Sequence, residues 1–219
     1  MTTAKRITVL ISGRGSNLAA LLAAMRSGTL GGTITRVVSS NRQAPGLDVA
    51  RAHGVASTTL DHRDHATRDA FDAALAEVLD AERPDLVVMA GFMRVLGEPF
   101  VQRHANRLIN VHPSLLPLYP GMHTHRRVLA DGVRIHGCTV HFVTPDVDAG
   151  PIIAQAAVPV HDDDDEASLA AKVLAQEYLV LPAAVRWFCE GRLVICGRQV
   201  RVNGVPQAAE AAALRVPPI

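Results

Sequence analysis

Apolar runs of strand length alternate along the chain with stretches of helical spacing, and this alternation restricts the fold more than any other feature. Runs typical of strands lie at 7–12, 34–39, 56–60, 86–90 and 108–112. Helical spacing lies between them, at 17–25, 47–52, 64–82 and 98–104. In the third helical stretch, Phe71, Leu75, Val78 and Leu79 share one face. Repeated strand–helix units predict a parallel sheet covered by helices.

The sequence changes character from about Gly137. Strand candidates at 139–143 and 152–160 are joined without a helix, which predicts antiparallel pairing at the far end of the sheet. A long helix is predicted at 167–188, where Pro182 should kink or divide it, and a small hairpin follows. The fold class is therefore α/β. We expect a mostly parallel, twisted sheet with a Rossmann-like N-terminal half, helices on both faces, and antiparallel strands toward the C-terminal half.

Charge and cysteine content exclude several classes of partner. Among 219 residues, 22 Lys and Arg balance 21 Asp and Glu, and no basic patch stands out, which argues against nucleic acid. Cys138, Cys189 and Cys196 are an odd, scattered set, typical of reduced thiols in the cytoplasm. The first residues lack the features of a signal peptide, and the apolar runs are too short for a bilayer. We expect a cytoplasmic protein that binds no membrane.

Asn110 and His112 close an apolar strand that Pro113 ends. Because side chains alternate along a strand, both point to the same side. The amide of Asn110 can donate to an oxyanion, and His112 can carry a proton near neutral pH. A carboxylate in a turn-rich acidic loop, Asp148, would orient the ring and favour its protonated form. With no evident Ser or Cys nucleophile, the three residues suit direct attack of an amine on an acyl group.

Each of these three residues also has a purely structural interpretation. An asparagine before a turn often bonds to local backbone, and a histidine at a strand end is often simply satisfied there. Asp148 can make an Asx turn before Gly150. Residue chemistry alone leaves both interpretations open.

A glycine-containing turn, 13–17, lies between the first strand and the first helix. Closely spaced glycines let backbone N–H groups face a ligand, and the helix N-terminus adds partial positive charge. The turn is not a dinucleotide fingerprint, because Leu18 stands where the third glycine would fall and no carboxylate ends the second strand. A single phosphate is favoured over NAD. The alternative is a tight turn that binds nothing.

No metal site is predicted. His123, His125, His136 and His141 lie near one another in sequence, but their spacing matches no usual zinc pattern and the cysteines are scattered. The acidic run 162–165 is expected to cap the following helix.

Several segments together resemble the folate-dependent phosphoribosylglycinamide formyltransferase family. The matching segments, in family order, are 11–17 (ISGRGSN), 90–96 (AGFMRVL), 110–117 (NVHPSLLP), 119–126 (YPGMHTHR), 136–143 (HGCTVHFV) and 148–152 (DAGPI). As a set they are highly specific, and they cover about residues 6–195. The resemblance implies a single formyltransferase domain over 1–205. The Ala- and Pro-rich segment 206–219 is expected to be a loosely ordered tail.

The resemblance also implies the reaction and its residues. The formyl group of 10-formyltetrahydrofolate, a co-substrate, is transferred to the amine of glycinamide ribonucleotide in purine biosynthesis. Its catalytic residues correspond to Asn110, His112 and Asp148. Its ribonucleotide-binding residues correspond to Gly15, Ser16, Asn17 and Glu177. Its folate-binding residues correspond to Arg68, Met93, Arg94, Val95, Leu96, Asn110, Thr144, Pro145, Asp146, Val147 and Asp148.

The match to the family has one departure and leaves three questions open. Arg14 follows the first glycine, where the family often has Asn, and Lys172 is a candidate cation for the phosphate. Alternative activities are hydrolysis of formyltetrahydrofolate, formylation of methionyl-tRNA, or binding without catalysis. The near-neutral charge and the absence of room for a further domain argue against the first two. An apolar helix face suits either a homodimer or the core, and spacing does not separate these.

Overall fold

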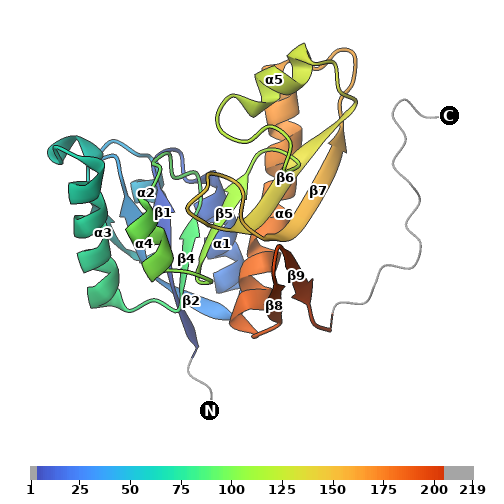
Figure 1. The fold of residues 1–219 in the computed structure, drawn as a ribbon. Coiled ribbons are helices and arrows are strands. Elements are labelled where there is room, and N and C mark those ends of the chain that lie inside the picture. Colours follow the sequence, from blue (N-terminus) through green and yellow to red (C-terminus); the bar gives the residue numbers. More distant parts are fainter. Residues whose placement is uncertain (1–3, 205–219) are drawn as a thin grey trace.

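The computed structural model describes residues 4–204, which form one nine-stranded sheet with helices on both faces (Figure 1). The strand order is β3-β2-β1-β4-β5-β6-β7-β9-β8. The strands are β1 (Lys5–Ile11), β2 (Gly32–Ser39), β3 (Ala56–Thr59), β4 (Leu86–Met89), β5 (Leu108–His112), β6 (Ile135–Phe142), β7 (Ile152–Pro159), β8 (Leu193–Cys196) and β9 (Gln199–Val202). The helices are α1 (Ser16–Arg26), α2 (Gly46–Ala52), η1 (His62–Asp64), α3 (Arg68–Glu82), α4 (Glu98–Arg103), α5 (Thr124–Ala130) and α6 (Glu166–Cys189).

The N-terminal half of the sheet is parallel, as the alternation of strands and helices predicts. β1 lies between β2 and β4, and β3 and β5 extend the parallel set on either side. Each connection passes through a helix or helical turn, which returns the chain to the same end of the sheet. The carboxyl ends of β1, β4 and β5 therefore meet along one edge.

Pairing becomes antiparallel where the helical crossovers stop. β6 pairs antiparallel with both β5 and β7, and Asn110 lies opposite His141 in the β5–β6 ladder. The register between β6 and β7 shifts at Val140 and His141, which marks a bulge. β8 and β9 form the expected hairpin, and β9 meets β7 at the sheet edge. The predicted fold class is confirmed in both halves.

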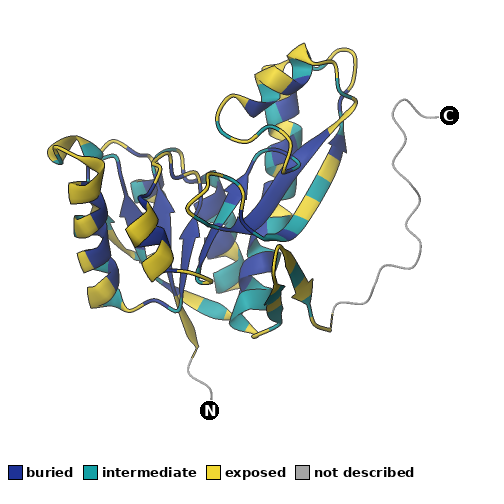
Figure 2. Ribbon diagram, viewed as in Figure 1, coloured by how far each residue is buried: buried dark blue, intermediate teal, exposed yellow. Residues whose placement is uncertain are grey.

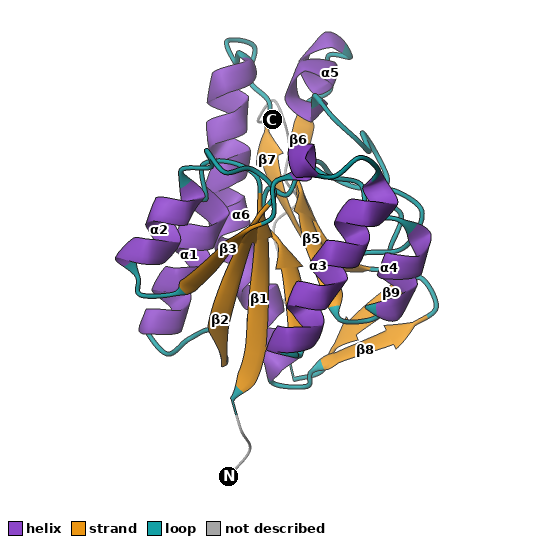
Figure 3. Ribbon diagram, turned by 90° about the vertical axis from the view of Figure 1, so that its left-hand side faces the viewer, coloured by secondary structure: helices purple, strands orange, loops and turns teal. Residues whose placement is uncertain are grey.

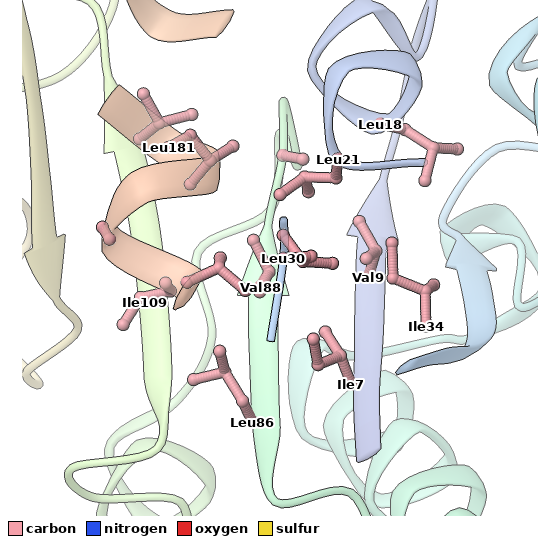
Figure 4. Close-up of a cluster of buried hydrophobic side chains, with 14 of the residues drawn as sticks. Ile7, Val9, Leu18, Leu21, Leu30, Ile34, Leu86, Val88, Ile109 and Leu181 are labelled. Carbon is pink, nitrogen blue, oxygen red and sulfur yellow. The ribbon is translucent and has the colours of Figure 1, made fainter. Parts of the chain in front are cut away.

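The core lies in layers on the two faces of the sheet. Helices α1, α2 and α6 cover one face and α3 and α4 cover the other (Figures 1 and 3). Along β1, Ile7, Val9 and Ile11 pack toward α1 and α6, and Leu10 packs toward α3. Figure 4 shows the first layer, where Leu21 and Leu181 meet side chains of the central strands. The central strands β4, β5 and β6 are accordingly buried, whereas β3, the β8–β9 hairpin and the outer helix faces are largely exposed (Figure 2).

Helix α6 is a single helix of 24 residues that passes through Pro182. The predicted division at Pro182 is wrong. Leu181, Ala184 and Val185 are fully buried, so packing around the proline holds the helix together across the missing hydrogen bond. Its length and hydropathy alone would allow α6 to cross a membrane, but here it packs against α1, β6 and β7. Asp165 caps its N-terminus in a capping box with Ser168, as the acidic run predicts.

One helix differs from the sequence prediction, and one predicted segment lies outside the described residues. Helix α5 was not predicted; it is only seven residues long, and His123 precedes it in a left-handed conformation without a side-chain cap. The tail predicted at 206–219 lies outside the described residues, as does the last residue of the predicted domain.

Candidate active site

One cleft of about 860 Å³ lies at the carboxyl ends of β1, β4 and β5. This edge is where ligands bind in open α/β sheets. The walls of the cleft are formed by the β1–α1 turn, the loop after β4, the end of β5, the β6–β7 loop and α6. The segment that leads into α5 and the start of α5 complete them. The predicted site residues that line it are Gly15, Ser16, Asn17, Met93, Arg94, Val95, Leu96, Asn110, His112, Thr144, Pro145, Val147, Asp148 and Glu177.

The three predicted catalytic residues lie together in this cleft. Asn110 and His112 occupy β5 with one residue between them, and Asp148 comes from the β6–β7 loop. Asp148 Oδ2 lies 3.4 Å from His112 Nδ1 and accepts a hydrogen bond from the Gly121 N–H at 2.8 Å. Asp148 itself has a φ of 53°, a left-handed conformation that aspartate tolerates better than most residues. The loop backbone thus turns the carboxylate toward the histidine.

The hydrogen bonds of His112 define what each ring nitrogen can do. Its Nε2 lies 3.0 Å from the carbonyl oxygen of Tyr119, which only accepts, so Nε2 carries a proton there. Nδ1 can then donate toward Asp148 only when the ring is an imidazolium. His112 is 6% exposed, so a protonated ring facing a carboxylate forms a charge-assisted pair that is largely shielded from water.

His141 is a functional candidate that sequence reasoning missed in this role. Its Nδ1 donates to the carbonyl oxygen of Phe142 at 2.9 Å, and its Nε2 lies 3.3 Å from Asn110 Nδ2. Burial lowers the pKa of His141, so the neutral ring accepts a hydrogen bond from the amide. One N–H of Asn110 is thereby held, and the other is left for a ligand. The strand pairing of Asn110 with His141 could have indicated this contact, had the register been known.

Asn17 and Glu177 both line the cleft and contact each other. Asn17 Nδ2 donates to Glu177 Oε2 at 2.6 Å, which joins the first turn of α1 to the middle of α6. Burial raises the pKa of Glu177. Asn17 is 7% exposed, and within residues 4–204 its Oδ1 has no hydrogen-bond partner. Two of the predicted ribonucleotide-binding residues, Asn17 and Glu177, are therefore hydrogen-bonded to each other, and Asn17 Oδ1 is left to accept a hydrogen bond from a ligand.

Gly15 shapes the turn that leads into this part of the cleft. It has a φ of 77°, and a Cβ there would lie 2.6 Å from the Cα of Gly46, so only glycine fits. It stands at the N-cap of α1 and offers no side-chain oxygen to the first-turn amides. Those amides have no acceptor within the helix and are free for an anion.

Apolar side chains dominate the other wall, where the folate residues were predicted. Met93, Val95 and Val147 all line the cleft and are more than half exposed. Ser12 Oγ accepts the Met93 N–H at 2.8 Å, which ties this loop to the end of β1. Exposed apolar side chains beside a cleft are typical of a ligand-binding surface.

Three residues named from the sequence lie apart from the cleft lining. Arg68 begins α3, and Asp146 lies in the β6–β7 loop, but neither lines the cleft. Their folate contacts stay predictions. Lys172 also lies outside the lining and is paired with Asp164 at 2.7 Å.

The remaining histidines form a pair beside the site. His125 lines the cleft, and its Nδ1 lies 3.1 Å from Nε2 of the buried His136. Burial lowers the pKa of both, to about 4 for His136. Within the described chain, no three His, Cys, Asp or Glu side chains are grouped as metal ligands.

Comparisons with known proteins show the family of the chain. The formyl transferase family model matches residues 5–185. Phosphoribosylglycinamide formyltransferase of Escherichia coli (strain K12) is 48% identical over 187 residues, covering 85% of this chain and 88% of that protein. The trifunctional purine biosynthetic protein adenosine-3 of Drosophila melanogaster is 46% identical. The match covers 87% of this chain but only 14% of the length of that protein.

A solved structure shows the same fold. Glycinamide ribonucleotide transformylase 1 from Symbiobacterium toebii superimposes with a TM-score of 0.89 at 49% identity, covering 91% of this chain and 94% of that one. The resemblance found in the sequence is thus confirmed over nearly the whole described chain. The chain belongs to the formyl transferase family, and its relatives there include the phosphoribosylglycinamide formyltransferases.

Proposed function

We propose that the protein transfers the formyl group of 10-formyltetrahydrofolate to the amine of glycinamide ribonucleotide. One observation carries this proposal. A single cleft is lined by the polar β1–α1 turn, by apolar side chains of the loop after β4, and by Asn110, His112 and Asp148. Binding both substrates in one cleft also supplies proximity, which can contribute about 7–11 kcal/mol in favourable cases. Location in the cytoplasm and assembly as a homodimer stay predictions.

The reaction is direct attack of the substrate amine on the formyl carbon. A C–N bond forms, the bond between the formyl carbon and folate N10 breaks, and the proton lost by the amine ends on N10. The free N–H of Asn110 donates a hydrogen bond to the tetrahedral oxyanion, and the positive charge of the protonated His112 ring, whose N–H groups face Tyr119 and Asp148, stabilises it electrostatically. Asp148 holds the imidazolium and, through a water molecule, receives the proton that the new ammonium must lose and passes it to N10 as the bond to N10 breaks.

A covalent acyl-enzyme fits the site poorly. Cys138 is fully buried, and burial raises the pKa of its thiol to about 12, so no thiolate is available at neutral pH. Ser114 is also fully buried, and its Oγ donates to the carbonyl oxygen of Leu118 at 2.6 Å. The nucleophile is therefore the substrate amine.

The test is production of tetrahydrofolate, followed by absorbance with and without glycinamide ribonucleotide. Ribonucleotide-dependent product supports the proposal. Product that forms equally without the ribonucleotide indicates a hydrolase, and binding by calorimetry without product indicates a binding protein. Either of these results contradicts formyl transfer to the ribonucleotide.

Asp148→Asn tests the catalytic assignment. We expect kcat to fall on the order of 100- to 10,000-fold, the usual contribution of a proton-transfer group, while the dissociation constants of both substrates change little. Asp163→Asn removes an exposed carboxylate and should leave kcat unchanged. A near-normal single-turnover rate for Asp148→Asn would remove this residue from the mechanism.

A further inference from the structure

The positive charges of the cleft are few. Among residues 4–204, Arg14 and Arg94 are the only Lys or Arg side chains that line it. Arg94 follows β4, on the apolar wall between Met93 and Val95. Arg14 lies in the β1–α1 turn, two residues before the first-turn amides of α1.

The facing wall supplies no competing cation. Helix α6 contributes Ala167, Ala170, Ala171, Leu174 and Glu177 to the cleft, which are small, apolar or acidic. The other lining residues that can become positive are histidines, and burial lowers the pKa of His125 and His141. Among the described residues that line the cleft, Arg14 is therefore the permanent positive charge that the β1–α1 turn itself supplies.

Arg14 has no partner within the described chain. Its side chain is exposed, and it takes part in no ion pair or hydrogen bond among residues 4–204. Lys172, by contrast, is engaged: it donates to Asp164, whose side chain is only 4% exposed. An unpaired guanidinium at the rim of a cleft is free to bind an incoming anion.

Independent features beside Arg14 also indicate a ligand. The first-turn amides of α1 lack a side-chain cap, and the nearby Oδ1 of Asn17 is buried without a partner. The amides suit an anion, while the Asn17 oxygen suits a hydroxyl or N–H donor on the same molecule. A phosphate ester that carries hydroxyl groups satisfies both requirements.

We propose that Arg14 is the cation that binds the phosphate of the ribonucleotide substrate, a role that rests on the proposed function. The guanidinium presents paired N–H donors that match phosphate oxygens, and the helix amides hold the remaining oxygens. The family often has a neutral Asn at this place, which brings no charge to the turn. In this chain the positive charge of Arg14 makes binding of the ribonucleotide depend on the negative charge of its phosphate.

Arg14→Ala and Arg14→Asn should raise the KM for glycinamide ribonucleotide about tenfold, the lower range for a hydrogen bond to a charged group, because the side chain is exposed. The kcat should stay within about twofold, because the lost contact stabilises the bound ribonucleotide and the transition state equally. The KM for formyl folate should not change. Arg26→Ala, an exposed and unpaired arginine at the other end of α1, is the matched control.

The decisive comparison uses glycinamide ribonucleoside, which lacks the phosphate. Wild type and Arg14→Ala should have the same kcat/KM on it. Raising the salt concentration should weaken wild-type binding of the ribonucleotide and hardly affect the variant. A defect of Arg14→Ala that persists with the ribonucleoside, or one that appears in the KM for formyl folate, overturns the proposal.

Inorganic phosphate separates this proposal from the proposed function. Its dissociation constant, measured by calorimetry without any turnover, should rise by a similar factor in Arg14→Ala and remain unchanged in Arg26→Ala. Equal phosphate affinity in wild type and Arg14→Ala overturns the role of Arg14 even if formyl transfer is active. Failure of wild-type turnover with a clear loss of phosphate binding contradicts only the reaction.

Discussion

Replacement of Glu177 tests how the cleft is held together. Its carboxylate is 6% exposed and accepts the 2.6 Å hydrogen bond from Asn17, across 160 residues of sequence. Glu177→Ala leaves a buried amide donor unpaired, which costs about 1–3 kcal/mol, and removes one buried methylene worth about 0.8 kcal/mol. Release of a buried carboxylate offsets part of this loss, so we expect a net destabilisation of about 2–3 kcal/mol.

Thermal unfolding measures this loss directly. For a chain of this size, 1 kcal/mol corresponds to about 2–4 °C, so Glu177→Ala should lower Tm by about 5–10 °C. Glu77→Ala, on the exposed face of α3, should change stability by less than about 0.5 kcal/mol. A Tm for Glu177→Ala within 2 °C, roughly 1 kcal/mol, of wild type would refute the role of this hydrogen bond.

Glu177→Gln gives the same experiment a pH signature. The pKa of Glu177 is raised in the folded protein by burial, so its contribution to stability is complete below the pKa of the unfolded chain and is lost as pH rises through the folded value. Gln stays neutral throughout. The Tm of Glu177→Gln minus that of wild type should therefore increase from acid toward neutral pH. A difference that instead grows toward acid pH would contradict the assignment.

Three further variants probe the supports of the site. Asp72→Ala removes the carboxylate that accepts a 2.6 Å hydrogen bond from the end of the loop after β4, so steady-state kinetics should show about a tenfold higher KM for formyl folate with ribonucleotide KM unchanged. His141→Phe removes the acceptor of the Asn110 amide and should lower kcat about 100-fold, with no additional loss in a double variant with Asn110→Ala. Gly150→Ala would place a Cβ 1.8 Å from the carbonyl oxygen of Phe142, so calorimetric Tm and kcat should both fall.

The layered sheet was predictable because its signals are local. Apolar runs and helical spacing record which face of each segment is buried, and β1 and α3 follow that pattern residue by residue. Strand alternation likewise placed Asn110 and His112 on one side before any tertiary contact was known. The glycine turn was recognisable because Gly15 meets a steric requirement that only one residue type satisfies.

The rest depends on contacts between distant segments. The role of His141 follows from the register of an antiparallel ladder, and periodicity within one strand does not contain that register. Lys172 is the candidate cation in the sequence, but the structure places it outside the cleft lining and in contact with Asp164, whereas Arg14 lines the cleft. Pro182 breaks a helix by local rules, but buried neighbours on both sides outweigh the missing hydrogen bond.

The switch to antiparallel pairing at β5 has a consequence for how activity is acquired during folding. Before β6 pairs with β5, Asn110 lacks the His141 ring opposite it, and the β6–β7 loop does not bring Asp148 to the cleft. Pairing of β6 with β5 is therefore required before a collapsed chain becomes an active enzyme. In refolding experiments, helical circular dichroism should recover before turnover, and the lag should measure the docking of β6 and β7.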